Sequence, residues 1–174
     1  MMADDTRPTG PRRRSRRPHP LAREVHRRLI ERNLTLGLAE SCTGGLVADL
    51  ITDLSGSSAY FLGSAVTYAN SAKEGVIGVR GETLALYGAV SAETAAEMAR
   101  GARRVFDADI GAAVTGIAGP TGATPGKPVG LVYIHLSAED AEWGERHVWD
   151  GNRLANKAHS AEAVLALLLR YLTA

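Results

Sequence analysis

The sequence predicts an α/β fold, with helices packed against a mixed β-sheet in a single compact domain. Segments in which apolar residues recur at helical spacing alternate along the chain with short apolar or alternating runs. The last two of these runs have the pattern of an antiparallel pair, so the sheet should be mixed. A chain of 174 residues with 45% hydrophobic residues is long enough for one core of ordinary size.

The first elements in this scheme are a helix, a strand and a second helix. Residues 21–33 carry apolar side chains at every third or fourth position and charged ones between them, which predicts a surface helix. Residues 34–39 alternate and predict a short strand. Gly44–Gly45 interrupts the pattern before helical spacing resumes over 46–54, so this stretch is a strand-loop-helix junction.

A turn and a second strand should follow, and then several helices. Residues 59–68 are rich in aromatic and β-branched side chains and follow a glycine-serine turn, which predicts a strand. Short helices are expected over 72–77 and 82–86. Ser91 is placed as the N-cap of a longer helix, with an acid in its first turn and a buried stripe that reaches Phe106.

The remaining residues predict a central strand, a hairpin and a final helix. Residues 110–115 form a short apolar run that is followed by a glycine, as expected of a strand covered on both faces. A long loop should occupy 116–130 and precede a strand over 131–136. The alternating run that contains Trp143, His147 and Trp149 predicts an antiparallel partner for that strand, and the chain should end with a helix over 152–172.

Residues 1–20 differ in composition from the rest and are predicted to be a disordered basic tail, so the folded domain should comprise residues 21–174. The tail holds six arginines and two aspartates, several prolines and no apolar periodicity. Because the whole chain has a net charge of only +1, the domain is mildly acidic. We therefore do not expect it to bind nucleic acid, unless through the tail.

Other function classes are excluded by the same reading. No apolar run approaches eighteen residues and no secretory h-region is visible, so we expect a cytoplasmic protein without a membrane span. The only cysteine, Cys42, cannot form an internal disulfide. The five histidines are scattered and no Cys/His spacing suits zinc, so neither a metal nor another cofactor is expected.

The strand-loop-helix junction carries the first candidate site. The N–H groups of the turn Thr43–Gly44–Gly45 should lie at the positive end of the following helix and could hold an anion or an oxyanion. The alternative is a glycine turn that only packs helix against strand. Ser41 is placed as a nucleophile would be, although it could equally be the helix N-cap.

Cys42 competes with Ser41 for the role of nucleophile, because a thiol at a helix N-terminus is acidified. The alternative is a small buried apolar residue. Neighbours at a strand end point in opposite directions, so only one of the two should face a site.

A serine also needs a base, and no histidine lies in a triad pattern. Lys73 follows a strand end; if it is desolvated, it could act as a neutral base, and otherwise it is a solvated lysine. Arg153 opens the last helix and could bind a phosphate or carboxylate with its planar fork.

The glycine-rich loop over 116–130 is not a P-loop. Gly122 and Gly126 are separated by three residues rather than four, and Pro128 stands where a Ser or Thr must follow the lysine. A long loop at the end of a strand remains a good place for a ligand site in an α/β protein.

Five motifs together resemble the CinA C-terminal domain family, over a region from about Leu21 to the C-terminus. The motifs are Ala39-Glu-Ser-Cys-Thr-Gly-Gly45, Val66-Thr-Tyr-Ala-Asn70 with Lys73, Gly88-Ala-Val-Ser91, Val114-Thr-Gly-Ile-Ala-Gly-Pro120 and Lys127-Pro-Val-Gly130. Five motifs in one order are far more specific than any one of them.

The resemblance implies metal-free hydrolysis of nicotinamide mononucleotide to nicotinic acid mononucleotide and ammonia, in NAD recycling. It implies Ser41 as nucleophile, Lys73 as base and Tyr68 as a helper in the proton network. The substrate-binding residues are then expected to be Thr43, Gly44, Gly45, Asn70, Thr115, Gly116 and Arg153. The oxyanion role of the Thr43–Gly45 turn is our inference from helix geometry. Self-association is also plausible from the resemblance.

Two departures from the family pattern concern the last helix, where an aspartate and a second arginine are common. Asn152 and Lys157 occupy these positions, and a lysine lacks the bidentate geometry of arginine. Ala69 and Ser71 also depart from the commoner motif. The alternative to an amidase is a catalytically silent nucleotide-binding or interaction module whose tail contacts nucleic acid.

Overall fold

The computed structural model describes residues 17–174 and confirms the predicted α/β class. Its five strands form one mixed sheet in the order β2-β1-β3-β4-β5. β1 pairs in parallel with β2 and β3, while β4 and β5 are antiparallel. The strands are β1 (Leu36–Glu40), β2 (Phe61–Val66), β3 (Ile110–Gly116), β4 (Leu131–Ser137) and β5 (Glu142–Val148).

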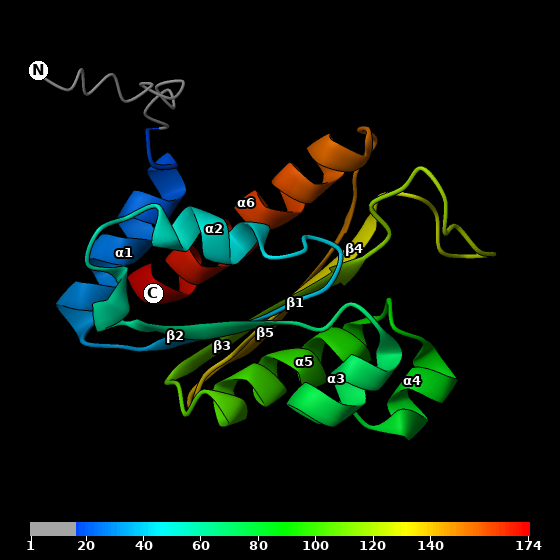
Figure 1. Cartoon of the computed structure of the whole chain (residues 1–174), viewed down its shortest axis with the longest axis horizontal. Coiled ribbons are helices and arrows are strands. Elements are labelled where there is room, and N and C mark those ends of the chain that lie inside the picture. Colours follow the sequence, from blue (N-terminus) through cyan, green and yellow to red (C-terminus); the bar gives the residue numbers. More distant parts are fainter. Residues whose placement is uncertain (1–16) are drawn as a thin grey trace, which may run out of the picture.

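Helices cover both faces of this sheet (Figure 1). One face is covered by α1 (Pro20–Arg32), α2 (Leu46–Thr52) and α6 (Arg153–Thr173), and the other by α3 (Asn70–Ile77), α4 (Gly81–Tyr87) and α5 (Ala92–Val105). Ser91 is the N-cap of α5, as predicted, because its side chain accepts a hydrogen bond from Thr94 N.

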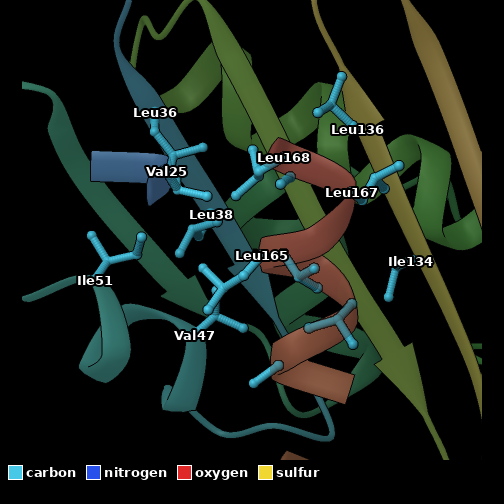
Figure 2. Close-up of a cluster of buried hydrophobic side chains, with 14 of the residues drawn as sticks. Val25, Leu36, Leu38, Val47, Ile51, Ile134, Leu136, Leu165, Leu167 and Leu168 are labelled. Carbon is cyan, nitrogen blue, oxygen red and sulfur yellow. The ribbon is translucent and has the colours of Figure 1, made fainter. Parts of the chain in front are cut away.

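The two faces of the sheet have cores of different character. Leu36 and Leu38 of β1 meet Leu165 and Leu168 of α6 on one face, together with aliphatic residues of α1 and α2 (Figure 2). The other face is lined by small residues, so α5 lies very close: a Cβ placed on Gly111 would be 2.1 Å from the Ala99 carbonyl oxygen. Packing against helices on both faces holds the strands of the sheet in place.

Most predicted elements are present, with shifted ends. The strand predicted over 34–39 is observed two residues later at its start, and the strand predicted over 59–68 is shorter, because residues 57–59 form a 3-10 turn. The predicted disordered tail lies largely outside the described residues. Pro20, the last residue that we assigned to the tail, is the first residue of α1.

The crossovers that follow β1 and β2 run over opposite faces of the sheet. The crossover from β1 to β2 runs through α2 on one face, and the crossover from β2 to β3 runs through α3, α4 and α5 on the other face (Figure 1). In open α/β sheets, ligands bind at the carboxyl ends of strands where successive crossovers diverge in this way.

Candidate active site

A cavity of about 230 Å³ lies at the carboxyl ends of β1, β2 and β3. Six of the residues that we predicted for the site line it: Ser41, Tyr68, Lys73, Thr115, Gly116 and Arg153. The rest of its wall consists of Cys42, Ala89, Val90, Ile117, Ala118, Gly119, Thr121 and Gly122. The fold thus brings together side chains that are separated by more than one hundred residues in the sequence.

Ser41 and Lys73 form the central contact of this cavity. Lys73 Nζ lies 3.0 Å from Ser41 Oγ, and the exposed fractions of the two residues are 1% and 8%. Ser41 is held just beyond β1, where its N–H donates to the Val114 carbonyl oxygen. Lys73 is carried on the second turn of α3 and points inward. Sequence reasoning left open whether Lys73 is desolvated or solvated, and the structure has the desolvated lysine.

The surroundings of Lys73 favour its neutral form. Besides Ser41 Oγ, the amine nitrogen is 2.7 Å from the Thr67 carbonyl oxygen and 3.5 Å from that of Tyr68. Burial lowers the pKa of Lys73 below its ordinary value. In its neutral form the amine has two N–H groups, which can donate to these two carbonyl oxygens, and one lone pair. Because a carbonyl cannot donate, the lone pair is left for the Ser41 hydroxyl proton.

Tyr68 and Arg153 form a second group at the mouth of the cavity. Tyr68 follows β2 and is 58% exposed, and its hydroxyl accepts a hydrogen bond of 2.8 Å from Arg153 Nη2. Arg153 Nη1 donates to the Gly119 carbonyl oxygen at 2.8 Å. Since both of these partners are uncharged, the positive charge of the guanidinium remains available to an anionic ligand.

Thr115 connects the end of β3 to the segment between α4 and α5. Its Oγ1 donates to the Ala89 carbonyl oxygen at 2.7 Å, and Thr115 itself is buried. This bond holds Ala89 and Val90 against the cavity. Sequence reasoning gave these two residues no role, although the motif Gly88–Ser91 contains them.

The prediction that the Gly45 N–H, in the turn before α2, binds an anion of the ligand is wrong. The Glu40 carboxylate of the protein itself occupies this position. Gly45 N–H and Thr43 Oγ1 both donate to the buried Glu40 side chain. The Gly44 N–H donates to the Ser41 carbonyl oxygen. None of Thr43, Gly44 and Gly45 lines the cavity.

The positive φ angles of Gly44 and Gly45 explain the glycine pair as a backbone requirement. Gly45, and not Ser41, is the N-cap of α2. Asn70, which we also predicted to bind substrate, is the exposed first residue of α3 and lies outside the cavity wall.

Cys42 lines the same cavity as Ser41, so the prediction that only one of them faces a site is wrong. Both residues lie beyond the last residue of β1, where strand alternation no longer applies. Burial, with a smaller contribution from the Glu40 charge, raises the pKa of Cys42 to about 12. The thiol is therefore protonated at neutral pH, as expected of a buried apolar residue.

The structure gives Asn152 a capping role in the last helix and places Lys157 near the glycine turn. Asn152 is the N-cap of α6, and its side chain accepts a hydrogen bond from Ala155 N at 3.0 Å. Lys157, one turn beyond Arg153, brings its Nζ to 3.6 Å from the position that a Cβ on Gly44 would occupy. A cation thus lies beside the glycine turn.

The described residues contain no set of three or more His, Cys, Asp or Glu side chains that could hold a metal ion. Within the same part of the chain, no helix is both long enough and apolar enough to cross a membrane.

Comparison with known proteins gives one consistent family. A sequence model described as the CinA C-terminal domain matches residues 18–172. A CinA-like protein of Syntrophus aciditrophicus (strain SB) is 50% identical over 149 residues, which are 84% of this chain and 35% of that protein. A CinA-like protein of Leptospira borgpetersenii serovar Hardjo-bovis (strain L550) is 53% identical over 119 residues, or 68% of this chain and 28% of that protein. The chain therefore spans about a third of the length of these curated relatives.

Two solved structures have the same fold over nearly their whole length. Competence damage-inducible protein A from Klebsiella pneumoniae subsp. pneumoniae MGH 78578 superposes with a TM-score of 0.87 at 35% identity, covering 91% of this chain and 98% of that one. The competence/damage inducible protein CihA from Agrobacterium tumefaciens gives a TM-score of 0.85 at 39% identity, with 88% and 94% covered.

Proposed function

The chain belongs to the CinA C-terminal domain family, and from this premise we propose that it is a serine amidase that hydrolyses nicotinamide mononucleotide to nicotinic acid mononucleotide and ammonia. The observation that carries the proposal is the 3.0 Å contact between Ser41 Oγ and the buried Lys73 Nζ. A serine beside a neutral amine is an activated nucleophile. Its target is an acyl group, and the carboxamide of the nucleotide supplies one.

In the proposed first half-reaction, Ser41 Oγ attacks the carboxamide carbon while its proton passes to Lys73 Nζ. The tetrahedral intermediate then collapses, the C–N bond breaks, and the departing nitrogen takes that proton from Lys73 and leaves as ammonia. The product is an ester between Ser41 and the nicotinoyl group.

In the second half-reaction a water molecule attacks this ester and gives a proton to Lys73. Collapse of the second intermediate breaks the bond to Ser41, whose Oγ regains the proton. One amide and one water are consumed, and one carboxylic acid and one ammonia are formed. All four proton transfers therefore pass through Lys73 Nζ, and two of them cross its 3.0 Å contact with Ser41 Oγ.

The size of the cavity and its charge support a nucleotide substrate. At about 230 Å³ it is smaller than the roughly 300–1,000 Å³ usual for a site that encloses a whole drug-sized ligand. It would thus enclose the reacting ring, while the phosphate would lie at the mouth, beside Arg153. We propose that Tyr68 orients this arginine through the 2.8 Å hydrogen bond to its hydroxyl.

The experiment that tests this proposal is an assay of ammonia release from nicotinamide mononucleotide by the purified protein, with the Ser41→Ala variant in parallel. Ammonia release that depends on Ser41 supports the amidase. A folded wild-type protein that releases none would remove the proposal and leave the alternative of a non-catalytic nucleotide-binding module.

A further inference from the structure

The carboxylate of Glu40, the residue before Ser41, is buried and surrounded by hydrogen-bond donors. Its exposed fraction is 1%. We infer that Glu40 is a positioning residue: it holds the turn that carries Ser41 so that Oγ stays at Lys73 Nζ. This inference rests on the proposed function in that it assigns Ser41 as the nucleophile.

Five groups donate to this one carboxylate. Oε2 accepts from Thr43 Oγ1 at 2.7 Å, Gly45 N at 2.9 Å and Val47 N at 3.2 Å, and Oε1 accepts from Ala48 N at 2.9 Å and Ser64 Oγ at 3.3 Å. The donors come from the turn, from the first residues of α2 and from β2. Glu40 therefore joins β1 to two separate pieces of the chain behind the nucleophile, residues 43–48 and β2.

The chemistry of these donors requires a carboxylate. The first N–H groups of a helix have no partners within it, and the helix dipole favours a negative charge there. Two carboxylate oxygens can accept all five bonds. A glutamine has one acceptor oxygen, and in the same orientation its NH₂ group would face the Ala48 N–H, so at least one backbone donor would lose its partner.

Glu40 acts on Ser41 through the backbone. The Ser41 N–H is held by the Val114 carbonyl oxygen, and the Ser41 carbonyl oxygen accepts from Gly44 N. With the carboxylate of residue 40 fixed to residues 43 and 45, the turn is restrained on both sides of the serine. Glu40 is not part of the cavity wall, so it has no contact with a bound substrate.

Asp109, an exposed carboxylate, offers a control at the other end of the sheet. It lies just before β3, and its Oδ2 accepts from Thr35 N at 2.8 Å and from Thr35 Oγ1 at 2.6 Å. Asp109→Asn therefore replaces a carboxylate that also accepts a backbone N–H, but far from Ser41. Comparison with Glu40→Gln separates a loss of position at the nucleophile from a general loss of stability.

The experiment measures kcat and KM for nicotinamide mononucleotide and, separately, the rate at which a fluorophosphonate labels Ser41, followed by mass spectrometry. For Glu40→Gln we expect kcat and the labelling rate to fall together by about 10–100-fold, since a displacement near 1 Å can cost about 10²-fold. KM should stay within about twofold. The pH at which the rate is half-maximal should not move, because Lys73 remains the base. Asp109→Asn should leave both rates unchanged.

A folded Glu40→Gln protein with the kcat and labelling rate of the wild type would overturn the inference, as would an equal loss in Asp109→Asn. If Glu40→Gln does not fold, Thr43→Val is the second variant, because it removes only one donor. We expect it to lower the labelling rate by a smaller factor, of about 3–10-fold, and an unchanged labelling rate overturns the inference.

Labelling of wild-type Ser41 without ammonia release would reject the proposed substrate, and the labelling rates would still decide the role of Glu40. A wild-type Ser41 that neither reacts with the probe nor supports turnover overturns both.

Discussion

Ser41 Oγ lies 3.0 Å from Lys73 Nζ, although the two residues come from different elements, the turn after β1 and helix α3. The nearest partners of the amine are this hydroxyl and two backbone carbonyl oxygens, and none of them carries a charge. A lysine buried in this way is costly to protonate. The arrangement therefore favours a proton acceptor, and its consequences can be measured.

The first prediction concerns the dependence of the reaction rate on pH. With the neutral amine as the proposed base, kcat/KM should rise as the pH increases through the lowered pKa of Lys73 and then level off. Lys73→Arg should lose about 10²–10⁴-fold in kcat, since a guanidinium stays charged. A profile that is flat from pH 5 to pH 10 would show that no such base limits the rate.

The second prediction concerns stability. Lys73 has a lowered pKa in the folded protein and an ordinary one, near about 10.4, in the unfolded chain. Between these two values only the unfolded chain binds the proton, so the free energy of unfolding rises with pH across this window.

Lys73→Met removes the amine that binds the proton and nearly keeps the shape of the side chain. Its unfolding free energy should exceed that of the wild type most strongly below the window, and the difference should shrink as the pH approaches about 10.4. Urea unfolding at pH 6 and pH 10 measures this, with Lys127→Met on the loop as the control. If the two proteins differed by the same unfolding free energy at both pH values, burial would not disfavour the charged form of Lys73.

The third prediction concerns Cys42. With its pKa raised to about 12, the thiolate fraction at pH 8 is about 10³-fold lower than for an ordinary thiol. Iodoacetamide should thus modify Cys42 very slowly in the folded protein and rapidly after unfolding. Cys42→Ala should keep kcat within about threefold. Fast modification that also abolishes activity would instead favour Cys42 as the nucleophile.

The fourth prediction concerns Arg153 and the phosphate of the substrate. A hydrogen bond to a charged group contributes about 1.5–3 kcal/mol, so Arg153→Ala should lower kcat/KM for the nucleotide by about 10–100-fold. Turnover of nicotinamide riboside, which lacks the phosphate, should hardly change. Equal losses for both substrates would show that Arg153 shapes the cavity through Tyr68 and Gly119 and does not recognise the phosphate.

Periodicity predicted the elements well because each helix and strand buries a face that repeats along the sequence. The apolar residues of α6 meet Leu36 and Leu38, as their spacing indicates. The burial of Lys73 could not be predicted in this way, because a lysine on a short polar helix is usually solvated. The packing of α3 against α5, with Lys73 Nζ at Ser41 and at the Thr67 carbonyl oxygen, removes its amine from water.

For the turn before α2, the sequence indicated the kind of site but not the group that occupies it. Its glycines and the following helix correctly indicated a set of backbone N–H groups that attract an anion, but the anion is Glu40, five residues before Gly45. An acidic residue next to a predicted helix N-terminus is a usable signal for such an internal partner. The proximity of Tyr68 to Arg153, in contrast, depends on the path of the whole chain and has no local signal.

The most direct test of the amidase is the stoichiometry of products formed from nicotinamide mononucleotide by the wild type and by Ser41→Ala. We expect the wild type to release one ammonia for each nicotinic acid mononucleotide, and the variant, which lacks the nucleophile, to be slower by at least about 10³-fold. A Ser41→Ala variant that releases ammonia as fast as the wild type would contradict the account.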